Sequence, residues 1–143
     1  MLVAHVLREK GVIVHAISSE ATLEEAARDL LTKRVGALVV FDGSEALIGV
    51  LSERDIIREI ARRGAAALAD TVGAAMSRGV ITAAPDESVD ECLGRMTDRR
   101  VRHLPVIEEG RLIGVVSIGD LVKMRIMAVE AQAAAMQAYI ATG

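Results

Sequence analysis

Aromatic side chains are nearly absent from this sequence. Phe41 and Tyr139 are its only aromatic residues, and there is no tryptophan. So few rings leave almost no surface on which single-stranded bases could stack. An excess of positive charge is also lacking, because 17 Lys and Arg stand against 20 Asp and Glu. No global positive field would therefore hold a phosphate backbone, and binding of DNA or RNA is only a remote alternative.

Cysteine is equally scarce. Cys92 is the single one, so the chain cannot form an internal disulfide, which fits a reducing compartment. Residues 1–11 carry too short an apolar run for a signal peptide. Lysine, arginine, glutamate and glutamine interrupt the apolar C-terminal stretch, which argues against a membrane span. We therefore expect a cytoplasmic protein that does not associate with membranes.

Patterns typical of metal sites and enzymes are missing. The three histidines do not have metal-ligand spacing, and there is no Cys-x-x-Cys. The sequence contains no nucleophile elbow, no phosphate-loop pattern and no Gly-x-Gly-x-x-Gly. We therefore predict no bound metal, no obligatory cofactor and no catalytic activity.

What the sequence does contain is an internal repeat. "GVLSERDII" at 49–57 returns 65 positions later as "GVVSIGDLV" at 114–122. Residues 22–41 align with 88–107 at an offset of 66. The duplication extends from about 11 to 63 and from about 79 to 125. Such self-similarity indicates two copies of one structural unit.

Each repeat is predicted to begin with a short strand and a helix. The strands are the apolar runs 12–14 and 80–82. Capping boxes, Thr22 with Glu25 and Ser88 with Glu91, indicate where the helices start. The predicted buried stripes of these helices are Leu23, Ala26, Ala27, Leu30 and Leu31, and Val89, Cys92, Leu93 and Met96.

Two aliphatic strands and a second helix complete each repeat. The strands are expected at 36–41 and 47–51, joined by a hairpin loop at 42–46, and at 103–107 and 112–116, joined by a loop at 108–111. Residues 64–79 read as a linker with a short helix at 72–76. This predicts an α/β (α+β) fold of tandem βαββα motifs packed as one pseudo-two-fold module. The predicted domains are 1–66, 67–127 and a helical extension at 128–143.

The C-terminal stretch has a heptad pattern. Val122, Ile126, Val129, Ala133, Met136 and Ile140 are spaced 4, 3, 4, 3 and 4 positions apart. This spacing is typical of the seam between two paired helices. We predict a helix that mediates dimerisation; the alternative is a helix packed on its own subunit.

The repeated sequences "GALVVFDGSEALIGVLSERDII" and "RHLPVIEEGRLIGVVSIGDLV" resemble a cystathionine-β-synthase (CBS) domain pair, or Bateman module. The resemblance covers nearly the whole chain and implies a stand-alone pair that forms homodimers. It also implies that adenine nucleotides or related adenosyl compounds bind in clefts between the two motifs. The first repeat has Ser19 and Glu20 where the second has Pro85 and Asp86 before its helix.

The chemistry of Ser-x-x-Asp fits such a ligand. Where a strand turns into a helix at Ser52 or Ser117, the free N–H groups of the helix favour a phosphate. Asp55 and Asp120 can accept hydrogen bonds from both hydroxyls of a ribose. Ser-x-x-Asp is also a helix-capping signature, so capping alone is the alternative interpretation.

Further site residues follow from the resemblance. It groups Ser52, Arg54 and Asp55 with Arg102 and His103, and it groups Ser117 and Asp120 with Lys33 and Arg34. It assigns the adenine walls to the leading strands, at Ile13 and Val14 and at Val80 and Ile81, for which plain core packing is the alternative. Arg95 and Arg99 are expected on a solvated helix face. The Asp55 site is expected to bind charged ligands more tightly, because it gathers more arginine.

These observations predict a regulatory sensor that is not an enzyme. Its ligand would be AMP, ADP, ATP, NAD(H) or S-adenosylmethionine, and an unknown effector protein would respond to binding. The alternative is an interaction scaffold that has lost its ligands.

Overall fold

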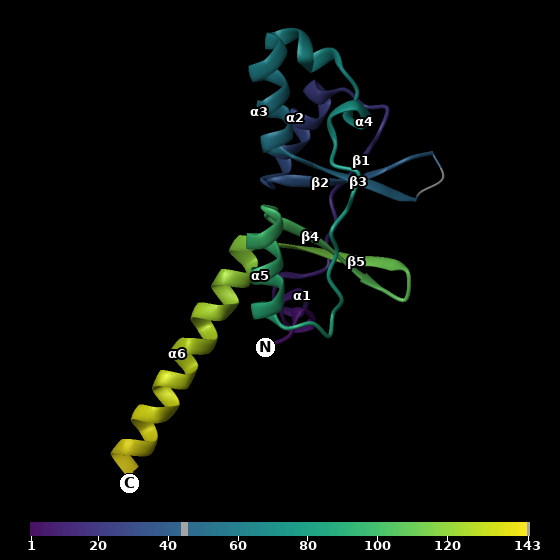
Figure 1. Ribbon diagram of the computed structural model, residues 1–143. Coiled ribbons are helices and arrows are strands. Elements are labelled where there is room, and N and C mark those ends of the chain that lie inside the picture. Colours follow the sequence, from purple (N-terminus) through teal and green to yellow (C-terminus); the bar gives the residue numbers. More distant parts are fainter. Residues whose placement is uncertain (44–45, 143) are drawn as a thin grey trace. The chain divides into compact units, whose positions relative to one another are not determined.

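The structure is a computed structural model that describes residues 1–43 and 46–142 (Figure 1). The chain divides into two compact units. The first-repeat unit is Ile13–Ile81, and the second-repeat unit combines Met1–Val12 with Thr82–Gly143. Each unit contains one copy of the sequence repeat.

The first-repeat unit is built on a three-stranded sheet with the order β1-β2-β3. β1 (Ala16–Ser18) pairs with β2 (Ala37–Phe41) in parallel, and β2 pairs with β3 (Leu47–Ser52) in antiparallel fashion. The helices are α2 (Leu23–Lys33), α3 (Glu53–Arg63), the 3-10 helix η1 (Gly64–Ala69) and α4 (Val72–Ala75). The core of this unit includes Leu23, Leu30, Leu38, Val40, Leu51 and Ile56.

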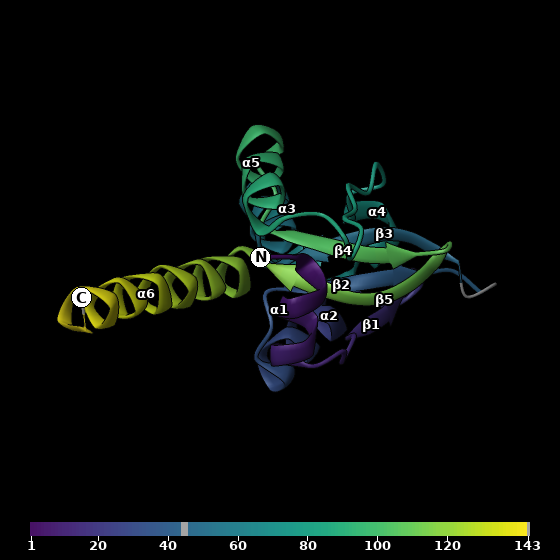
Figure 2. The ribbon, with the colours of Figure 1, turned by 90° about the horizontal axis from the view of Figure 1, so that it is seen from below.

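The second-repeat unit contains a two-stranded sheet. β4 (His103–Glu108) and β5 (Arg111–Ser117) pair in antiparallel fashion, and Figure 2 shows them side by side. Glu109 and Gly110 connect them with positive φ angles of 50° and 78°, as a two-residue type I′ hairpin turn requires. The helices of this unit are α1 (Val3–Lys10), α5 (Val89–Arg99) and α6 (Ile118–Thr142).

The predicted order of elements is confirmed in its main features. Both repeats have a capped helix, a hairpin of two strands and a second helix. The linker helix predicted at 72–76 is α4, and η1 precedes it although no pattern indicated it. The predicted loop at 42–46 includes 44 and 45, which lie outside the described residues.

The predicted leading strands were placed too early in the sequence. β1 begins at Ala16 rather than at 12, and Ile13 is 74% exposed. In the second repeat, residues 80–82 lie outside any strand, and Ala83 alone pairs with Val106. Register depends on which residues reach the hydrogen-bonding groups of the middle strand, and an apolar run does not specify that.

The predicted helix stripes are confirmed except at one end. Cys92, like Leu23, Ala26 and Met96, is buried, whereas Leu31 is 81% exposed. Leu31 lies beside a hollow of about 570 Å³ between α2 and α3, which Ala27, Val35, Ile56 and Ile57 also line. The stripe of α2 is therefore narrower than predicted, because Leu30 of the last turn is buried and its neighbour Leu31 is not.

The compact units divide the chain differently from the predicted boundaries. α1 belongs with the second repeat, since the N–H groups of Val3 and Ala4 donate to the carbonyls of Glu87 and Pro85, both at 2.9 Å. Residues 67–81 belong with the first repeat, where Val50 and Ser77 exchange two backbone hydrogen bonds of 3.1 and 3.0 Å. Contacts between distant segments of the chain create these groupings.

α6 continues far beyond the sheet of its own unit (Figures 1 and 2). At 25 residues it is about 37 Å long. Leu121 and Met124 are its buried residues, and beyond them the helix is exposed apart from the half-buried Ala128. No helix in the described part of the chain is long and apolar enough to cross a membrane.

Candidate functional site

The two Ser-x-x-Asp sequences form two strand-to-helix corners of the same geometry. Asp55 Oδ2 accepts hydrogen bonds from Ser52 N at 2.8 Å and Ser52 Oγ at 3.2 Å. Asp120 Oδ2 accepts one from Ser117 N at 2.9 Å. Each serine Oγ in turn accepts from the aspartate N, at 3.4 Å for Ser52 and 3.1 Å for Ser117. Both corners are therefore capping boxes, as the alternative interpretation of the sequence anticipated.

Each corner lies against the helix-to-strand bend of the same repeat. Glu53 N donates to Gly36 O at 3.0 Å, and Ile118 N donates to Arg102 O at 2.8 Å. His103 pairs directly with Ser117 across the hairpin. The structure thus brings Arg102 and His103 to the Ser117 corner of their own unit. The predicted crosswise grouping joins residues of different units and stays a prediction.

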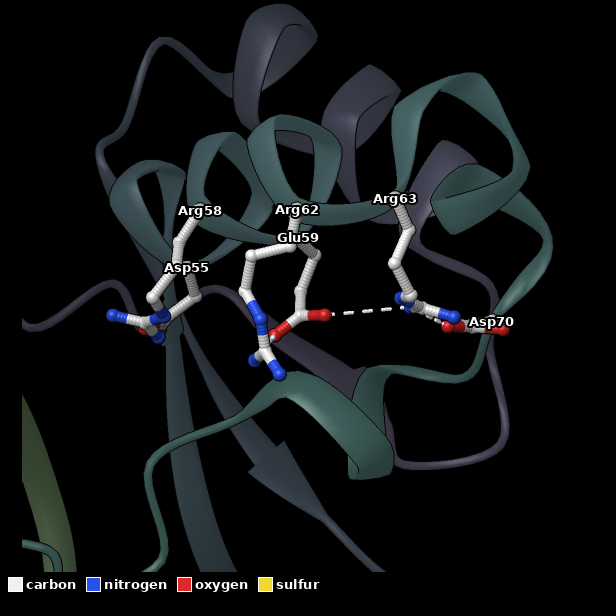
Figure 3. A network of polar contacts seen from close by, with 6 residues as sticks. All are labelled: Asp55, Arg58, Glu59, Arg62, Arg63 and Asp70. Atoms are coloured by element: carbon white, nitrogen blue, oxygen red, sulfur yellow. Dashed lines mark hydrogen bonds and ion pairs between the residues drawn. The ribbon is translucent and has the colours of Figure 1, made fainter.

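Asp55 is the more enclosed of the two aspartates, with 5% of its surface exposed. Arg58, one turn further along α3, forms an ion pair with its second oxygen, Oδ1 (Figure 3). Glu59, Arg62, Arg63 and Asp70 continue this line of ion pairs to the end of η1. Both oxygens of Asp55 are therefore engaged by its own repeat. Exposed pairs such as Glu59 with Arg62 stabilise a helix only slightly.

Asp120 has a different cation partner. Lys10 Nζ, at the end of α1, lies 2.7 Å from Asp120 Oδ2 and 2.6 Å from Val115 O. Burial raises the pKa of Asp120, but the hydrogen bonds from Lys10 and Ser117 and the charge of Lys10 together hold it below its ordinary value. Within 1–43 and 46–142, no hydrogen bond reaches the other oxygen, Oδ1. This oxygen can accept from a ligand without displacing a protein group.

The other predicted site residues differ in exposure. Arg34, Arg54 and Arg102 are exposed, whereas Lys33 forms an ion pair with Asp29 at 3.5 Å. Of the predicted adenine walls, Ile13 is exposed and Val14, Val80 and Ile81 are half-buried. Arg34 has left-handed backbone angles and ends α2.

Arg95 does not lie on a solvated helix face, which corrects the prediction. Its guanidinium donates to Thr82 O at 2.9 Å and forms an ion pair with Glu87. These bonds hold the segment before α5 against the helix. Arg99 is exposed, as expected.

Sequence reasoning missed Lys10 and Arg58. Arg58 had a local signal, because it stands three residues after Asp55 on a predicted helix, where side chains meet. No local sequence signal pointed to Lys10, because it is 110 positions from Asp120.

Two observations concern possible metal and thiol sites. The described residues contain no group of three or more His, Cys, Asp or Glu side chains that could hold a metal ion. Burial raises the pKa of the Cys92 thiol, which is typical of a core residue rather than a nucleophile.

The family of this chain follows from comparison with known proteins. A model of the CBS domain matches residues 6–62 and again residues 72–126. The chain therefore belongs to the CBS domain family, and it contains two CBS repeats. It is 35% identical over 130 residues to the mitochondrial CBS domain-containing protein CBSX3 of Arabidopsis thaliana, covering 88% of this chain and 63% of that one. The chain spans between 41% and 66% of the length of three such curated relatives.

Solved structures share the fold. The CBS-domain containing protein ATU1752 of Agrobacterium tumefaciens matches with a TM-score of 0.85 and 38% identity, over 87% of this chain and 92% of that one. PAE2072 of Pyrobaculum aerophilum, solved in complex with AMP, matches with a TM-score of 0.78 and 28% identity, over 91% of this chain and 97% of that one. The CBS pair of protein MJ0100 was solved with 5′-methylthioadenosine and S-adenosylmethionine. It matches with a TM-score of 0.71 and 25% identity, over 87% of this chain and 94% of that one.

Proposed function

We propose that this chain is a regulatory module that binds an adenosine-containing ligand and communicates its presence to a partner protein. One observation carries the proposal: a carboxylate and a serine stand together at a helix N-terminus in both repeats, and Asp120 keeps one oxygen open. The AMP and S-adenosylmethionine complexes of structural neighbours support the same class of ligand. AMP, ADP, ATP, NAD(H) and S-adenosylmethionine are the candidates.

The contacts within each repeat favour Asp120 over Asp55 as the residue that binds the ribose. A diol at Asp55 would have to share Oδ1 with Arg58, whereas Asp120 Oδ1 has no donor among the described residues. The expectation that the Asp55 site binds charged ligands more tightly rested on the number of arginines and stays a prediction. It did not count Arg58, which pairs with Asp55 on the same helix.

The phosphate and the adenine would use the remaining predicted residues. Arg102 and His103 stand beside Ser117 and the first turn of α6, where a phosphate would meet a positive helix end. In the first repeat the residues equivalent to Arg102 and His103 are Gly36 and Ala37. There the positive charge would come instead from Lys33 and Arg34, at the end of α2, and from Arg54, in the first turn of α3. Ile13, Val14, Val80 and Ile81 remain the candidates for packing against the adenine, because the chain has so few aromatic rings.

Calorimetric titration of the full chain with each candidate ligand tests the proposal. We expect at least one to bind. Asp120→Asn should weaken its binding about ten- to a hundredfold, since a charge-assisted hydrogen bond is lost. Asp98→Asn, on the exposed face of α5, is the matched control and should bind like the wild type. Absence of binding by every ligand would contradict the proposal.

The alternative is a scaffold that binds other proteins without a ligand. The completed capping boxes favour it, because Ser52, Asp55, Ser117 and Asp120 already have a structural role. The same titration separates the two functions: a scaffold leaves every ligand unbound in the wild type.

A homodimer is part of the proposal. The seam residues of α6 that the sequence singled out include Val122, Ile126, Val129, Met136 and Ile140, and all of these are exposed. A long helix without tertiary contacts gains little stability from its intrinsic propensity. A second copy of the chain has the same apolar residues at the same spacing on its own α6. Pairing of the two α6 helices would therefore bury the seam residues of each.

A further inference from the structure

Lys10 is held in place by the packing of α1 on β5. Val3, Val6 and Leu7 of α1 are buried. The Leu7 side chain occupies the space above Gly114, where a Cβ atom would lie 2.7 Å from Leu7 Cδ2. One helical turn later, Lys10 Nζ reaches Val115 O and Asp120 Oδ2. α1 therefore directs its last side chain to the start of α6.

The two repeats place their cations on different carboxylate oxygens. Arg58 binds Asp55 Oδ1, the oxygen that the serine does not use. Lys10 instead shares Asp120 Oδ2 with Ser117 N. The residue equivalent to Arg58 is Lys123, which is exposed and makes no hydrogen bond or ion pair with another described residue. Only the second repeat thus combines a neutralising cation with an open oxygen.

We propose that Lys10 is a positioning residue of the ligand site on the second repeat, holding Asp120 by Oδ2 so that Oδ1 accepts the ligand's diol. This inference rests on the proposed function. An ionised carboxylate is an acceptor at both oxygens and binds hydroxyl donors more strongly than a protonated carboxyl does. The half-buried setting of the pair, with 32% of the Lys10 and 26% of the Asp120 side chain exposed, makes this ionisation depend on a nearby positive charge.

Charged and polar groups come to the Asp120 corner from four elements. Lys10 comes from α1, Ser117 from β5, and Lys123 lies one turn along on α6. Arg102 and His103 stand at the adjoining bend and the start of β4, where His103 pairs with Ser117. Lys10 is the charged group in contact, and together with Ser117 it lowers the Asp120 pKa against the effect of burial. Without Lys10, the carboxylate should take up its proton at a higher pH, and binding of the diol should fail there too.

Lys10→Met tests the role, since it removes the charge and keeps the length of the side chain. Binding of adenosine and of AMP is measured between about pH 3 and pH 7, a range that includes the ordinary Asp pKa of about 3.9. We expect Lys10→Met to weaken both probes equally, by about threefold to tenfold at pH 7, and to move the acid limit of binding to higher pH. Lys10→Arg should restore both properties, and Lys123→Met should change neither.

The outcomes separate this inference from the proposed function. If neither probe binds the wild type, both fail. If the wild type binds and Lys10→Met has the same affinity and pH profile, only the positioning role is overturned. If Lys10→Met loses affinity for AMP but not for adenosine, Lys10 contacts the phosphate, and the positioning role is overturned as well. An NMR titration of the Asp120 carboxyl in the ligand-free protein should show protonation at higher pH in Lys10→Met, and an unchanged titration would also count against the inference.

Discussion

Gly49 lies against the backbone carbonyl of Ser77 so closely that a Cβ atom at position 49 would stand 2.8 Å from that oxygen. Val50 and Ser77 exchange two backbone hydrogen bonds beside this contact. The side chain of Met76 is also close to Gly49, whereas the atoms nearest to the equivalent glycine of the second repeat, Gly114, all belong to the side chain of Leu7. Glycine at equivalent positions of the two repeats thus allows close approach of a different neighbour in each.

Because of this difference, we predict that replacing glycine with alanine lowers the free energy of unfolding by unequal amounts at the two positions. Gly49→Ala should lower the free energy of unfolding by about 2–3 kcal/mol, because a backbone carbonyl cannot move aside without breaking its hydrogen bonds. Gly114→Ala should cost about 1 kcal/mol, since Leu7 can change rotamer. Urea denaturation of both variants measures the difference. Equal losses would show that Leu7 is as rigid as the Ser77 backbone.

Asp55 should be more important for stability than for ligand binding. Asp55→Ala removes the acceptor for Ser52 N and the partner of Arg58, so we expect a loss of about 1–2 kcal/mol, as for other helix caps. Affinity for AMP should fall much less than in Asp120→Asn. Calorimetry and a denaturant melt measure the two quantities. If Asp55→Ala loses more affinity than Asp120→Asn, the ribose binds at Asp55 in the first repeat.

Arg102 should distinguish ligands that carry a phosphate from those that do not. It lies at the bend beside Ser117, and its planar guanidinium can hold two phosphate oxygens. Arg102→Ala should therefore weaken AMP about tenfold or more and leave adenosine nearly unchanged. Arg99→Ala, on the exposed end of α5, is the control. Equal losses for the two ligands would mean that Arg102 supports the fold and not the site.

Glu87 should contribute to stability only above acidic pH. The hydrogen bond from Arg95 holds the pKa of Glu87 below its ordinary value of 4.5, against the effect of burial and with help from Ala84 N. Because the folded state has the lower pKa, the contribution is present above about pH 4.5 and is lost as the pH falls through the folded value. Urea melts between pH 3 and 7 should show a loss of about 1 kcal/mol that is absent in Glu87→Gln.

Truncation after Met127 should weaken the dimer. It removes the exposed seam residues from Val129 to Ile140 and leaves the buried Leu121 and Met124 in place. Light scattering should show a dimer for the full chain and a lower mass for the shortened one at the same micromolar concentration. A full chain that is monomeric would contradict the predicted seam.

Local sequence determined much of this protein. The Ser-x-x-Asp corners, the capping box at Thr22 and the linker helix α4 all depend on residues within a few positions of one another, so their patterns can be read directly. The internal duplication, with its offset of 65 positions, revealed the two repeats because matching stretches can be compared directly in the sequence. The match to the CBS family confirmed what those patterns indicated.

Only the tertiary structure decided the rest. The apolar runs at 12–14 and 80–82 specified hydrophobicity but not register, so β1 begins at Ala16 instead. Leu31 fits the helix stripe, yet the tertiary structure leaves it 81% exposed beside a hollow between α2 and α3. The contact of Lys10 with Asp120 depends on α1 packing across β5, with 110 positions of chain between the two residues. A side chain brought in from that distance leaves no trace in the local pattern, because the packing of apolar surfaces, and not the spacing along the chain, determines where it lies.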